Sequence, residues 1–485
     1  MARVVILGAG ISGHTAALHL RRMLKKEHDV VVVTPNSKWN WIPSNIWVGV
    51  GKKTTEQVTF PLAPIYARKH IEFHQALATT IFPEGSADAA KPHVSIRYTD
   101  PARAGQEATL EYDYLINATG PKLNFAATPG LGPDGHTVSV CTPGHAIEAA
   151  TQLSGVIDKL RSGEKQTLVI GVGHGTCTCE GAAFEYAFNV EHELRLAGVR
   201  ELADVVYLTN EYELGDFGVG GMVFTQRGFE TTSKLWTESL FRERGVRAIT
   251  QAHVDRIEPG VIFYEQLDGT RSTLNYDFAM LLPPFRGADM TAFDAAGNDI
   301  TSTVFAPSGF MRVDADYNPK PYADWRSADW PSTYQTPQYT NVFSVGIAFA
   351  PPHQISEPRT SPSGVLIAPS PPRTGMPSGI MGRVVAQSIT DMIEHGATKP
   401  THTASMAKMG AACVASAGTG LRKGTAASMT MYPVVPDYQK YPGMGRSAKD
   451  TYGEIGLAGH WIKTVLHYMF IYKAKARLGW FLIPE

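Results

Sequence analysis

The sequence predicts an α/β protein with two Rossmann-like dinucleotide-binding domains and a C-terminal membrane-associating region. Each domain is predicted by a glycine-rich turn between an apolar strand and a helical segment, at 8–13 and at 171–176. A chain of 485 residues is too long for one hydrophobic core, which agrees with two or three domains. The third part is predicted by residues 461–473, where aromatic and aliphatic residues are mixed with cations, as in helices that lie at a bilayer surface.

The composition excludes several classes of protein. Hydrophobic residues make up 43% of the chain and charged residues 18%, so long disordered segments are not expected. The net charge of −1 gives no overall field that would attract nucleic acid. Four cysteines are too few for a disulfide scaffold. There is no classical secretory signal and no run of roughly 18 to 20 apolar residues, so the predicted attachment to a membrane is peripheral, or monotopic.

The first unit is a strand at 3–7, a helix at 11–26 and a second strand at 29–33. Glycines at the strand-to-helix turn let the backbone approach a pyrophosphate, and the start of the helix favours its negative charge. An acidic residue at position 34 would bind a ribose hydroxyl, but this position is Thr34, which weakens the NAD interpretation more than the FAD one. The predicted FAD-binding residues of this unit are Gly8, Gly10, Ser12, Gly13 and Thr34.

Two later strands are predicted to return to the first domain. One, at 111–120, ends in Ala118, Thr119 and Gly120, and the other, at 341–346, ends at Gly346. Strands with such endings often return toward the cofactor in flavoproteins with two dinucleotide-binding domains. We therefore expect both endings to contact FAD.

The second unit repeats this order of elements but has a different turn. The turn carries His174, and two cysteines follow it at Cys177 and Cys179. We would not expect a nicotinamide to bind well there, so the thiols are the candidate source of electrons for the flavin. Zinc sites use wider spacing and further ligands, so no metal is predicted. The predicted elements of this unit are strands at 167–171, 204–208, 245–257 and 276–282 and a helix at 182–196.

The remaining chain is predicted to be a loop rich in Pro, Ser and Gly at 351–377, a helix at 378–395 and a tail. Long loops in compact enzymes are often functional.

The predicted domains are 1–120, the first part of the FAD-binding domain; 121–165, a connection with Cys141; 166–300, the second Rossmann-like domain; 301–395, the second part of the FAD-binding domain; and 396–485, a C-terminal region with Cys413 and amphipathic helices for membrane and quinone.

Several blocks of the sequence resemble sulfide:quinone oxidoreductases, and the resemblance extends to about residue 480. The three blocks that contain cysteines carry most of it, because they occur in the family's order. The blocks are residues 4–10, 42–51, 114–122, 141–145, 179–186, 372–375 and 412–414. The resemblance implies an enzyme that oxidises sulfide to polysulfide or sulfur with FAD and passes two electrons to a membrane quinone.

The resemblance also implies roles for the cysteines. Cys413 and one of Cys177 and Cys179 match the redox-active pair, and counting back from residues 184–186 favours Cys179. Hydrosulfide would attack one sulfur of this pair and leave a persulfide and a thiolate. Cys141 matches a third cysteine that assists sulfur transfer and that binds FAD covalently in some members, which is left open here.

Further residues match the family's sites. Glu185 matches a candidate base and His145 a histidine near the sulfur. Arg373 would support negative charge on the reduced flavin. The resemblance adds Pro43, Asn45 and Arg373 to the predicted FAD contacts, and it implies quinone contacts at Gly375, Tyr468, Met469 and Phe470.

The sequence also departs from the family. Cys177 is extra, and residues 214–216, Leu-Gly-Asp, stand where a histidine is often found. Three alternatives are considered: the flavoprotein subunit of a flavocytochrome c sulfide dehydrogenase, a type II NADH:quinone dehydrogenase, and a flavin-bearing sensor without turnover. The length of the sulfur product, the quinone species, the membrane face and a homo-oligomeric state are left open.

Overall fold

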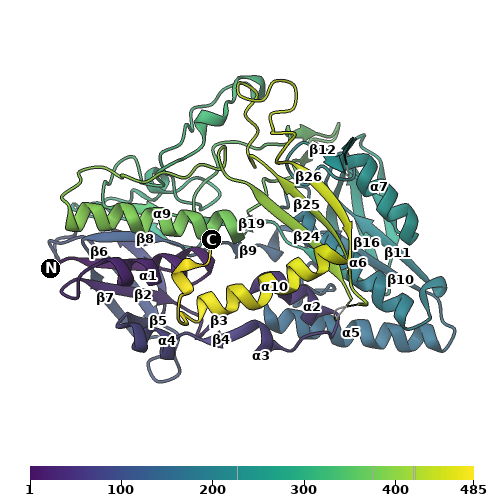
Figure 1. The fold of residues 1–485 in the computed structure, drawn as a ribbon, viewed down its shortest axis with the longest axis horizontal. Helices are drawn as coiled ribbons and strands as arrows, with labels where there is room; N and C mark the ends of the chain where they lie inside the picture. Colours follow the sequence, from purple (N-terminus) through teal and green to yellow (C-terminus); the bar gives the residue numbers. More distant parts are fainter. Residues whose placement is uncertain (227, 374, 419, 421) are drawn as a thin grey trace.

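A parallel sheet and its antiparallel extension form the first lobe of the protein. The computed structural model describes residues 1–226, 228–373, 375–418, 420 and 422–485. The first sheet has the strand order β21-β8-β1-β2-β5-β6-β7, with β20 paired to β5 (Figure 1). Its strands are β1 (Arg3–Leu7), β2 (Asp29–Thr34), β5 (Glu72–Phe82), β6 (His93–Tyr98), β7 (Glu107–Glu111), β8 (Tyr114–Asn117), β20 (Thr291–Ala292) and β21 (Val342–Ser344).

The second lobe is built on a smaller parallel sheet with the order β14-β11-β10-β18. Its centre, Leu168–Val172, is buried, because parallel strands are covered on both faces. An antiparallel sheet, β15-β16-β17, packs beside it. The strands are β10 (Gln166–Val172), β11 (Ala203–Leu208), β14 (Arg247–Ile249), β15 (Ala252–Glu258), β16 (Val261–Gln266), β17 (Arg271–Asn275) and β18 (Phe278–Leu282).

A third sheet joins the second lobe to the C-terminal region. Its order is β13-β12-β26-β25-β24, so strands from both sides of residue 395 belong to one sheet. The predicted division into domains stays a prediction, but the C-terminal region does not stand apart from the second lobe. The strands are β12 (Val223–Gln226), β13 (Phe229–Thr232), β24 (Ala411–Ala417), β25 (Thr425–Met431) and β26 (Tyr452–Gly456).

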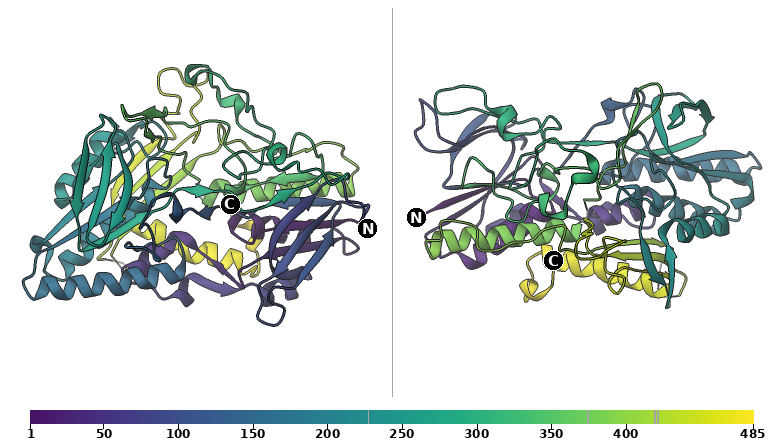
Figure 2. Two further views of the ribbon diagram at one scale, coloured as in Figure 1. Left: turned by 180° about the vertical axis from the view of Figure 1, so that it is seen from behind. Right: turned by 90° about the horizontal axis from the view of Figure 1, so that it is seen from above.

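The helices cover these sheets and meet between the lobes. α1 and α9 lie side by side on the first sheet, and α10 runs beneath both lobes (Figures 1 and 2). The close approach of α1 and α9 requires Gly382, because a Cβ atom there would lie 2.3 Å from the Ser12 carbonyl oxygen. The longer helices are α1 (Ile11–Met23), α5 (Pro143–Arg161), α6 (Glu180–Leu196), α7 (Ser233–Arg244), α9 (Gly375–Glu394) and α10 (Leu457–Ala474).

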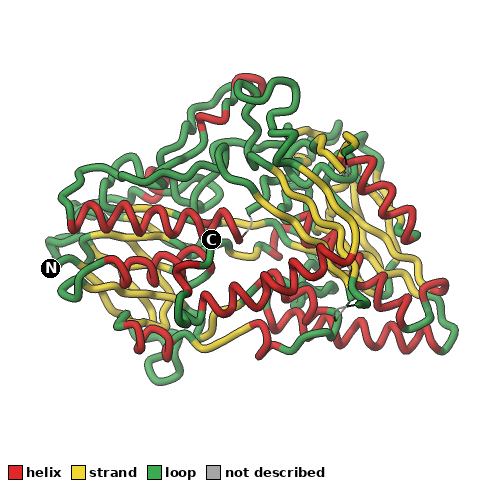
Figure 3. Tube along the Cα trace, in the orientation of Figure 1, coloured by secondary structure: helices red, strands yellow, loops and turns green. Residues whose placement is uncertain are grey.

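The connections between these elements contain only short pieces of secondary structure. Between α8 and α9 the chain is mostly loop (Figure 3). The short elements are β3 (Lys38–Asn40), β4 (Thr59–Pro61), β9 (Lys122–Leu123), β19 (Phe285–Arg286), β22 (Arg359–Thr360), β23 (Leu366–Ile367), α2 (Asn45–Gly49), α3 (Thr55–Val58), α4 (Ala63–Lys69) and α8 (Thr301–Val304). Single 3-10 turns are η1 (Ile42–Ser44), η2 (Phe125–Ala127), η3 (Arg200–Leu202), η4 (Tyr322–Asp324), η5 (Ser327–Asp329), η6 (Gly346–Ala348) and η7 (Trp480–Leu482).

The predicted α/β class and the two βαβ units are confirmed, with shifts at the ends of elements. The helix predicted at 378–395 begins three residues earlier, and the tail forms β24, β25 and β26 before its helix. Within the described ranges, no helix is both long enough and apolar enough to span a bilayer.

Candidate functional site

Three chain segments meet at the carboxyl ends of neighbouring parallel strands in the first lobe. The turn at Gly8 follows β1, the segment 118–120 follows β8, and Gly346 follows β21. Ligands of open α/β sheets bind at this end of the strands. The segments that the sequence predicted to contact FAD are therefore brought together.

The glycine turn of the first unit packs closely against the protein at Gly8 and Gly13 but is open at Gly10. A Cβ atom at Gly8 would lie 2.1 Å from the Ala118 carbonyl oxygen, and one at Gly13 would lie 2.1 Å from the Gly8 carbonyl oxygen. At Gly10, a Cβ atom would meet nothing within 4 Å. Among the described residues no side chain caps the start of α1, and its first turn has no acidic residue. This turn fits a pyrophosphate, which backbone N–H groups and the helix dipole stabilise.

The remaining predicted FAD residues of the first lobe lie on several elements. Ser12 and Thr34 are buried, and a Cβ atom at Gly346 would lie 2.2 Å from the Ser12 Oγ. Asn45 is buried and exchanges two hydrogen bonds with Asn40, 2.9 and 3.0 Å long. Pro43 lies in the turn η1 before it. Thr119 donates from its hydroxyl to the Asn117 Oδ1 at 2.8 Å, which fixes the segment after β8.

The second glycine turn is filled by the protein's own atoms. A Cβ atom at Gly175 would lie 2.6 Å from the Leu366 carbonyl oxygen and 3.0 Å from the His253 Nδ1. The Gly175 N–H donates to this His253 nitrogen at 3.1 Å, and its carbonyl accepts from the Ala368 N–H at 2.8 Å. Ser370 donates from its N–H to the Cys177 carbonyl at 2.9 Å. Because these backbone groups already have hydrogen-bond partners within the protein, they are not available to bind a second dinucleotide.

A histidine pair completes this filling. The rings of His174 and His253 meet edge to face, with centroids 4.5 Å apart. Burial lowers the pKa of His174 to about 4, and the neighbouring His253 lowers it further in the same direction. Both rings are therefore neutral near pH 7 and pack as apolar groups.

Cys179 has a strained backbone at the start of α6. It is the N-cap residue of this helix and has φ 71°, in the left-handed region that residues other than glycine rarely adopt. Such a conformation costs about 1–3 kcal/mol and occurs most often at functional sites. This backbone conformation redirects the chain, so that Cys179 lies at the end of the second glycine turn and at the start of α6.

Two further cysteines come close to this helix start. A Cβ atom at Gly181, two residues after Cys179, would lie 3.0 Å from the Cys413 Sγ, so this thiol packs on the first turn of α6. Cys413 belongs to β24, which packs along α6. Cys141 precedes α5 and is near enough to Cys179 to act on its pKa. All four cysteines are free thiols in the structure.

Burial raises the pKa of each of these three thiols. The pKa is raised to about 11 for Cys141, about 12 for Cys179 and about 11 for Cys413. The charge of Glu180 raises the Cys179 pKa further, and the cationic Arg373 opposes this. These thiols stay protonated near pH 7 until a neighbouring group takes the proton.

Cys177 has a different environment from the other three. It is fully buried, and its thiol donates to the Leu282 carbonyl at 3.2 Å. It therefore occupies the core of the second sheet, as a buried cysteine ordinarily does.

Glu185 forms a buried ion pair with Lys463. The Lys463 ammonium, from α10, donates to the Glu185 Oε1 and to the Val414 carbonyl at 3.2 Å. The Ser416 N–H donates to the same carboxylate oxygen at 3.2 Å. Burial raises the Glu185 pKa, and Lys463 opposes that rise. The pair lies beside Cys413, since both charges act on that thiol's pKa.

His145 and Arg373 complete the surroundings of the thiols. His145 lies in the first turn of α5, four residues after Cys141, and its buried Nδ1 has no hydrogen-bond partner among the described residues. Arg373 donates to the carbonyls of Ile347 at 2.6 Å and Phe349 at 2.9 Å, which fixes its charge beside η6. Burial lowers the Arg373 pKa to about 10. Its charge also acts on the pKa of Cys179, so the guanidinium lies near both η6 and this thiol.

The predicted quinone residues do not all share one surface. Tyr468 and Met469 line an apolar groove of about 380 Å³ on the outside of α10, with Thr464, Val465, Tyr472 and Ile483. Phe470 instead stacks on Trp41, with ring centroids 5.0 Å apart. Gly375 lies at the start of α9, where a Cβ atom would be 2.9 Å from the Ile11 Cδ1.

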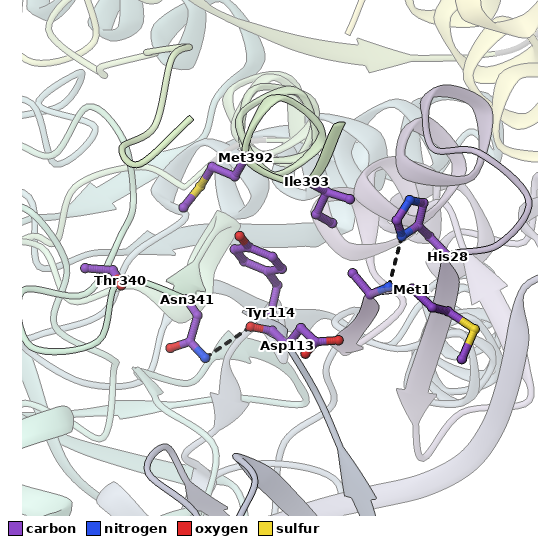
Figure 4. A pocket seen from close by; sticks show the side chains of 9 residues that line it. Met1, His28, Asp113, Tyr114, Thr340, Asn341, Met392 and Ile393 are labelled. Carbon is purple, nitrogen blue, oxygen red and sulfur yellow. Dashed lines mark hydrogen bonds between the residues drawn. The ribbon is translucent and has the colours of Figure 1, made fainter. Parts of the chain in front are cut away.

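A second hollow, of about 400 Å³, lies at the opposite end of the first sheet (Figure 4). It is lined by Met1, His28 and Asp113 among others, at the amino ends of the strands, where ligands of parallel sheets do not usually bind. Within the described residues, no group of three or more His, Cys, Asp or Glu side chains is placed to hold a metal ion.

Sequence reasoning missed Lys463 and Glu180. Lys463 had a signal: His460, Lys463 and His467 recur at helical spacing within an otherwise apolar helix, and all three are buried. Such a polar stripe indicates a helix face that contacts polar partners. Glu180 follows Cys179 directly, but a glutamate in the first turn of a helix is ordinarily exposed, so nothing distinguished it.

Comparison with known proteins agrees with this geometry. A model of the pyridine nucleotide-disulphide oxidoreductases matches residues 2–282. The chain is 28% identical over 472 residues to a sulfide-quinone reductase of Aquifex aeolicus, which covers 97% of this chain and 91% of that protein. A mitochondrial sulfide:quinone oxidoreductase of Dictyostelium discoideum is 23% identical over 352 residues, covering 71% of this chain and 64% of the relative.

Solved structures show the same architecture. The crystal structure of the sulfide:quinone oxidoreductase from Aquifex aeolicus matches with a TM-score of 0.75 and 26% identity, over 98% of this chain and 92% of that one. A structure of NDH2 from Plasmodium falciparum matches with a TM-score of 0.64 and 13% identity, over 99% and 97% of the two chains. The second likeness is one of fold alone.

Proposed function

The chain belongs to the pyridine nucleotide-disulphide oxidoreductase family and is an oxidoreductase homologous to sulfide-quinone reductase, and we propose that it oxidises sulfide and passes two electrons to a quinone. One observation carries this proposal. The position where a second dinucleotide would bind is filled, and the strained Cys179 beside it faces the helix turn on which Cys413 packs. Thiols therefore replace a nicotinamide as the entry for electrons.

The proposed sulfur chemistry uses Cys179 and Cys413, with Cys141 as the assisting thiol. Hydrosulfide attacks a sulfur bound between the two cysteines, and a persulfide and a thiolate result. Arg373 stabilises negative charge near Cys179. FAD, when bound at the first glycine turn, would accept two electrons from the sulfur and hand them to the quinone. Covalent attachment at Cys141, the length of the sulfur product and a homo-oligomeric state stay predictions.

The proposed quinone and membrane side is α10 with the segment that follows it. This helix buries its polar side chains, and it exposes apolar ones toward solvent: Ile462, Val465 and Tyr468 are each more than half exposed. After the helix, Leu478 is 95% and Leu482 76% exposed. Exposed apolar side chains on one helix face are typical of surfaces that contact a membrane or a partner. We propose that the groove beside Tyr468 and Met469 lies at a bilayer surface.

A type II NADH dehydrogenase is the nearest alternative by fold. The filled second turn argues against it, because NADH would have to displace Leu366 and His253. A flavocytochrome c subunit would pass its electrons to a haem protein, and the apolar face of α10 favours a quinone in a membrane instead. A sensor without turnover would not need three thiols at one helix start.

Anaerobic stopped-flow measurement of the flavin absorbance tests the proposal. We expect sulfide to bleach the flavin of the purified holoenzyme and NADH to leave it oxidised. A soluble quinone added afterwards should restore the absorbance without any cytochrome. Bleaching by NADH at a rate comparable to sulfide would contradict the proposal, and so would failure of the quinone to restore the absorbance.

A further inference from the structure

A short proline-rich segment, residues 368–371, is hydrogen-bonded to the chain that leads from the second glycine turn into α6. We call this segment the clamp; its sequence is Ala-Pro-Ser-Pro. The Ala368 N–H donates to the Gly175 carbonyl at 2.8 Å. The Ser370 N–H donates to the Cys177 carbonyl at 2.9 Å. Because proline has no N–H, these two groups are the clamp's only backbone donors, and both bind the same short stretch of chain.

Two hydroxyl groups add to these backbone bonds. The Ser370 hydroxyl donates to the Thr176 carbonyl at 3.1 Å, and the Thr178 hydroxyl donates to the Pro371 carbonyl at 3.0 Å. Thr178 is 5% exposed, so water does not readily replace its bond. Each of the four residues 175–178 is therefore hydrogen-bonded to the clamp.

Prolines make the clamp rigid, and contacts on other segments fix it in place. Three of the five residues 368–372 are prolines, whose rings restrict φ to about −65°. A Cβ atom at Gly218 would lie 2.2 Å from the Ser370 carbonyl oxygen, so the turn at Gly218 packs closely against the clamp. Beyond the clamp, Arg373 is fixed beside η6 by its bonds to two carbonyls. The clamp can therefore hold the chain that it contacts.

Cys179 lies between this clamped stretch and α6. Its φ of 71° is the rotation about the bond from its nitrogen to its Cα atom, so it depends on how the chain is held on both sides. On one side, the Cys179 carbonyl accepts from the Ala182 N–H at 2.8 Å and so belongs to the first turn of α6. On the other side, residues 175–178 are bonded to the clamp. A residue other than glycine keeps such a conformation only where the surrounding structure imposes it.

We propose, on the basis of the proposed function, that the clamp imposes the backbone conformation of Cys179 that sulfide oxidation requires, with Ser370 as a positioning residue. Ser370 takes part in no reaction step. Its effect passes through residues 175–178, whose position sets where the Cys179 thiol lies relative to the first turn of α6, on which Cys413 packs. A displacement of about 1 Å at a reacting group can slow a reaction by about 10²-fold, so a loosened clamp should slow the sulfur step.

Two variants at Ser370 loosen the clamp by different amounts. Ser370→Ala removes the bond to the Thr176 carbonyl. Ser370→Pro removes the bond to the Cys177 carbonyl as well and places a ring carbon where the N–H was. The Cys177 carbonyl keeps a bond from the buried Asn210 Nδ2 at 3.2 Å, so it is not left without a donor.

The test measures the two half-reactions of the flavin-loaded proteins separately by stopped-flow absorbance. We expect flavin bleaching by sulfide to slow by about 3- to 10-fold in Ser370→Ala and by about 10- to 100-fold in Ser370→Pro. Reoxidation by a soluble quinone after reduction with dithionite should keep its wild-type rate in both. A general loss of structure would slow both half-reactions, whereas a displaced Cys179 slows only the first. Should Ser370→Pro fail to bind flavin, Ser370→Ala decides the outcome.

Two further variants separate positioning from loss of packing. Ser370→Thr keeps both the N–H and a hydroxyl and should bleach nearly as fast as the wild type. Ser363→Ala removes a hydroxyl from the same loop whose bond goes to the Glu265 carboxylate instead, so it serves as the matched control and should bleach like the wild type. Bleaching as slow in Ser363→Ala as in Ser370→Ala would overturn the inference, because any loosening of the loop would then suffice.

Iodoacetamide labelling of the resting protein gives a readout without turnover. We expect Cys179 to label about 2- to 10-fold faster in Ser370→Ala than in the wild type, because a bond that opposes local opening is lost. Cys141 should label at an unchanged rate, and mass spectrometry of the cysteine peptides measures both.

Equal bleaching by sulfide in the wild type and in both Ser370→Ala and Ser370→Pro would overturn the inference alone. Slower bleaching with unchanged labelling of Cys179 would also overturn it, since the loss would then not come from the position of this residue. No bleaching of the wild type by sulfide would overturn the proposed function, and the role of the clamp with it.

Discussion

The two glycine turns of this protein begin equivalent βαβ units but have opposite surroundings. At the first, the space beyond Gly10 is open and the start of α1 has no side-chain cap among the described residues. At the second, Gly175 packs against Leu366 and His253, and its N–H and carbonyl are both hydrogen-bonded. The same local fold therefore has an open turn in one lobe and a packed turn in the other, because later parts of the chain decide whether the turn stays open.

The largest expected effect concerns the thiols that adjoin the filled turn. Cys179→Ser and Cys413→Ser should each slow flavin bleaching by sulfide by about 10³-fold or more, because a hydroxyl cannot form the sulfur bond. Stopped-flow absorbance measures this. Cys177→Ser should keep most of the rate, since the Cys177 thiol only donates to the Leu282 carbonyl. A large loss of rate in Cys177→Ser, together with a nearly unchanged rate in Cys179→Ser, would show that Cys177 and not Cys179 belongs to the redox pair.

A steric test of the open turn should have the next largest effect. Gly10→Val adds atoms where the protein has none within 4 Å, so the fold should form but FAD should bind about 10- to 100-fold more weakly. Flavin absorbance per protein after gel filtration, with circular dichroism as the control for folding, measures this. Full flavin content in this variant would mean that the cofactor does not approach Gly10.

The matching change in the filled turn should affect stability instead of flavin content. Gly175→Ala places a Cβ atom 2.6 Å from the Leu366 carbonyl oxygen, which should destabilise the protein by about 1–3 kcal/mol. Urea unfolding measures the free energy, and flavin content is the control. An unchanged free energy of unfolding would contradict the close packing of Gly175 against Leu366.

The smallest expected effect is a dependence on pH from His174. Its pKa is about 4 in the folded protein and 6.5 when unfolded, so the unfolded state binds more protons between these values. Stability should therefore fall as the pH drops from 6.5 toward 4, by about 1–2 kcal/mol after allowing for partial exposure. His174→Asn should reduce this loss in urea titrations at pH 7 and pH 4.5. An equal loss in both proteins would assign the effect to other groups.

Much of the fold and part of the site could be predicted from the sequence. Gly8, Gly13 and the apolar strands that flank them follow local rules, so the first unit was predicted together with its helix. The family blocks pointed to Cys179, Cys413 and Cys141, and the structure brings these cysteines to the start of α6 or near it. The sequence could not reveal that Glu185 forms an ion pair with Lys463 or that Cys177 is fully buried in the core. Both features depend on contacts with distant segments of the chain.

The sequence by itself determined the strands and helices of the two βαβ units and the residues that can carry redox chemistry, because these depend on periodicity and on side-chain type. Only the tertiary structure decided which glycine turn is open and which segment holds the chain before Cys179. Leu366 reaches Gly175 across some 190 residues, and Lys463 reaches Glu185 across 278. Such long-range packing sets the local dielectric and the available hydrogen bonds, and these in turn set what each cysteine and carboxyl can do.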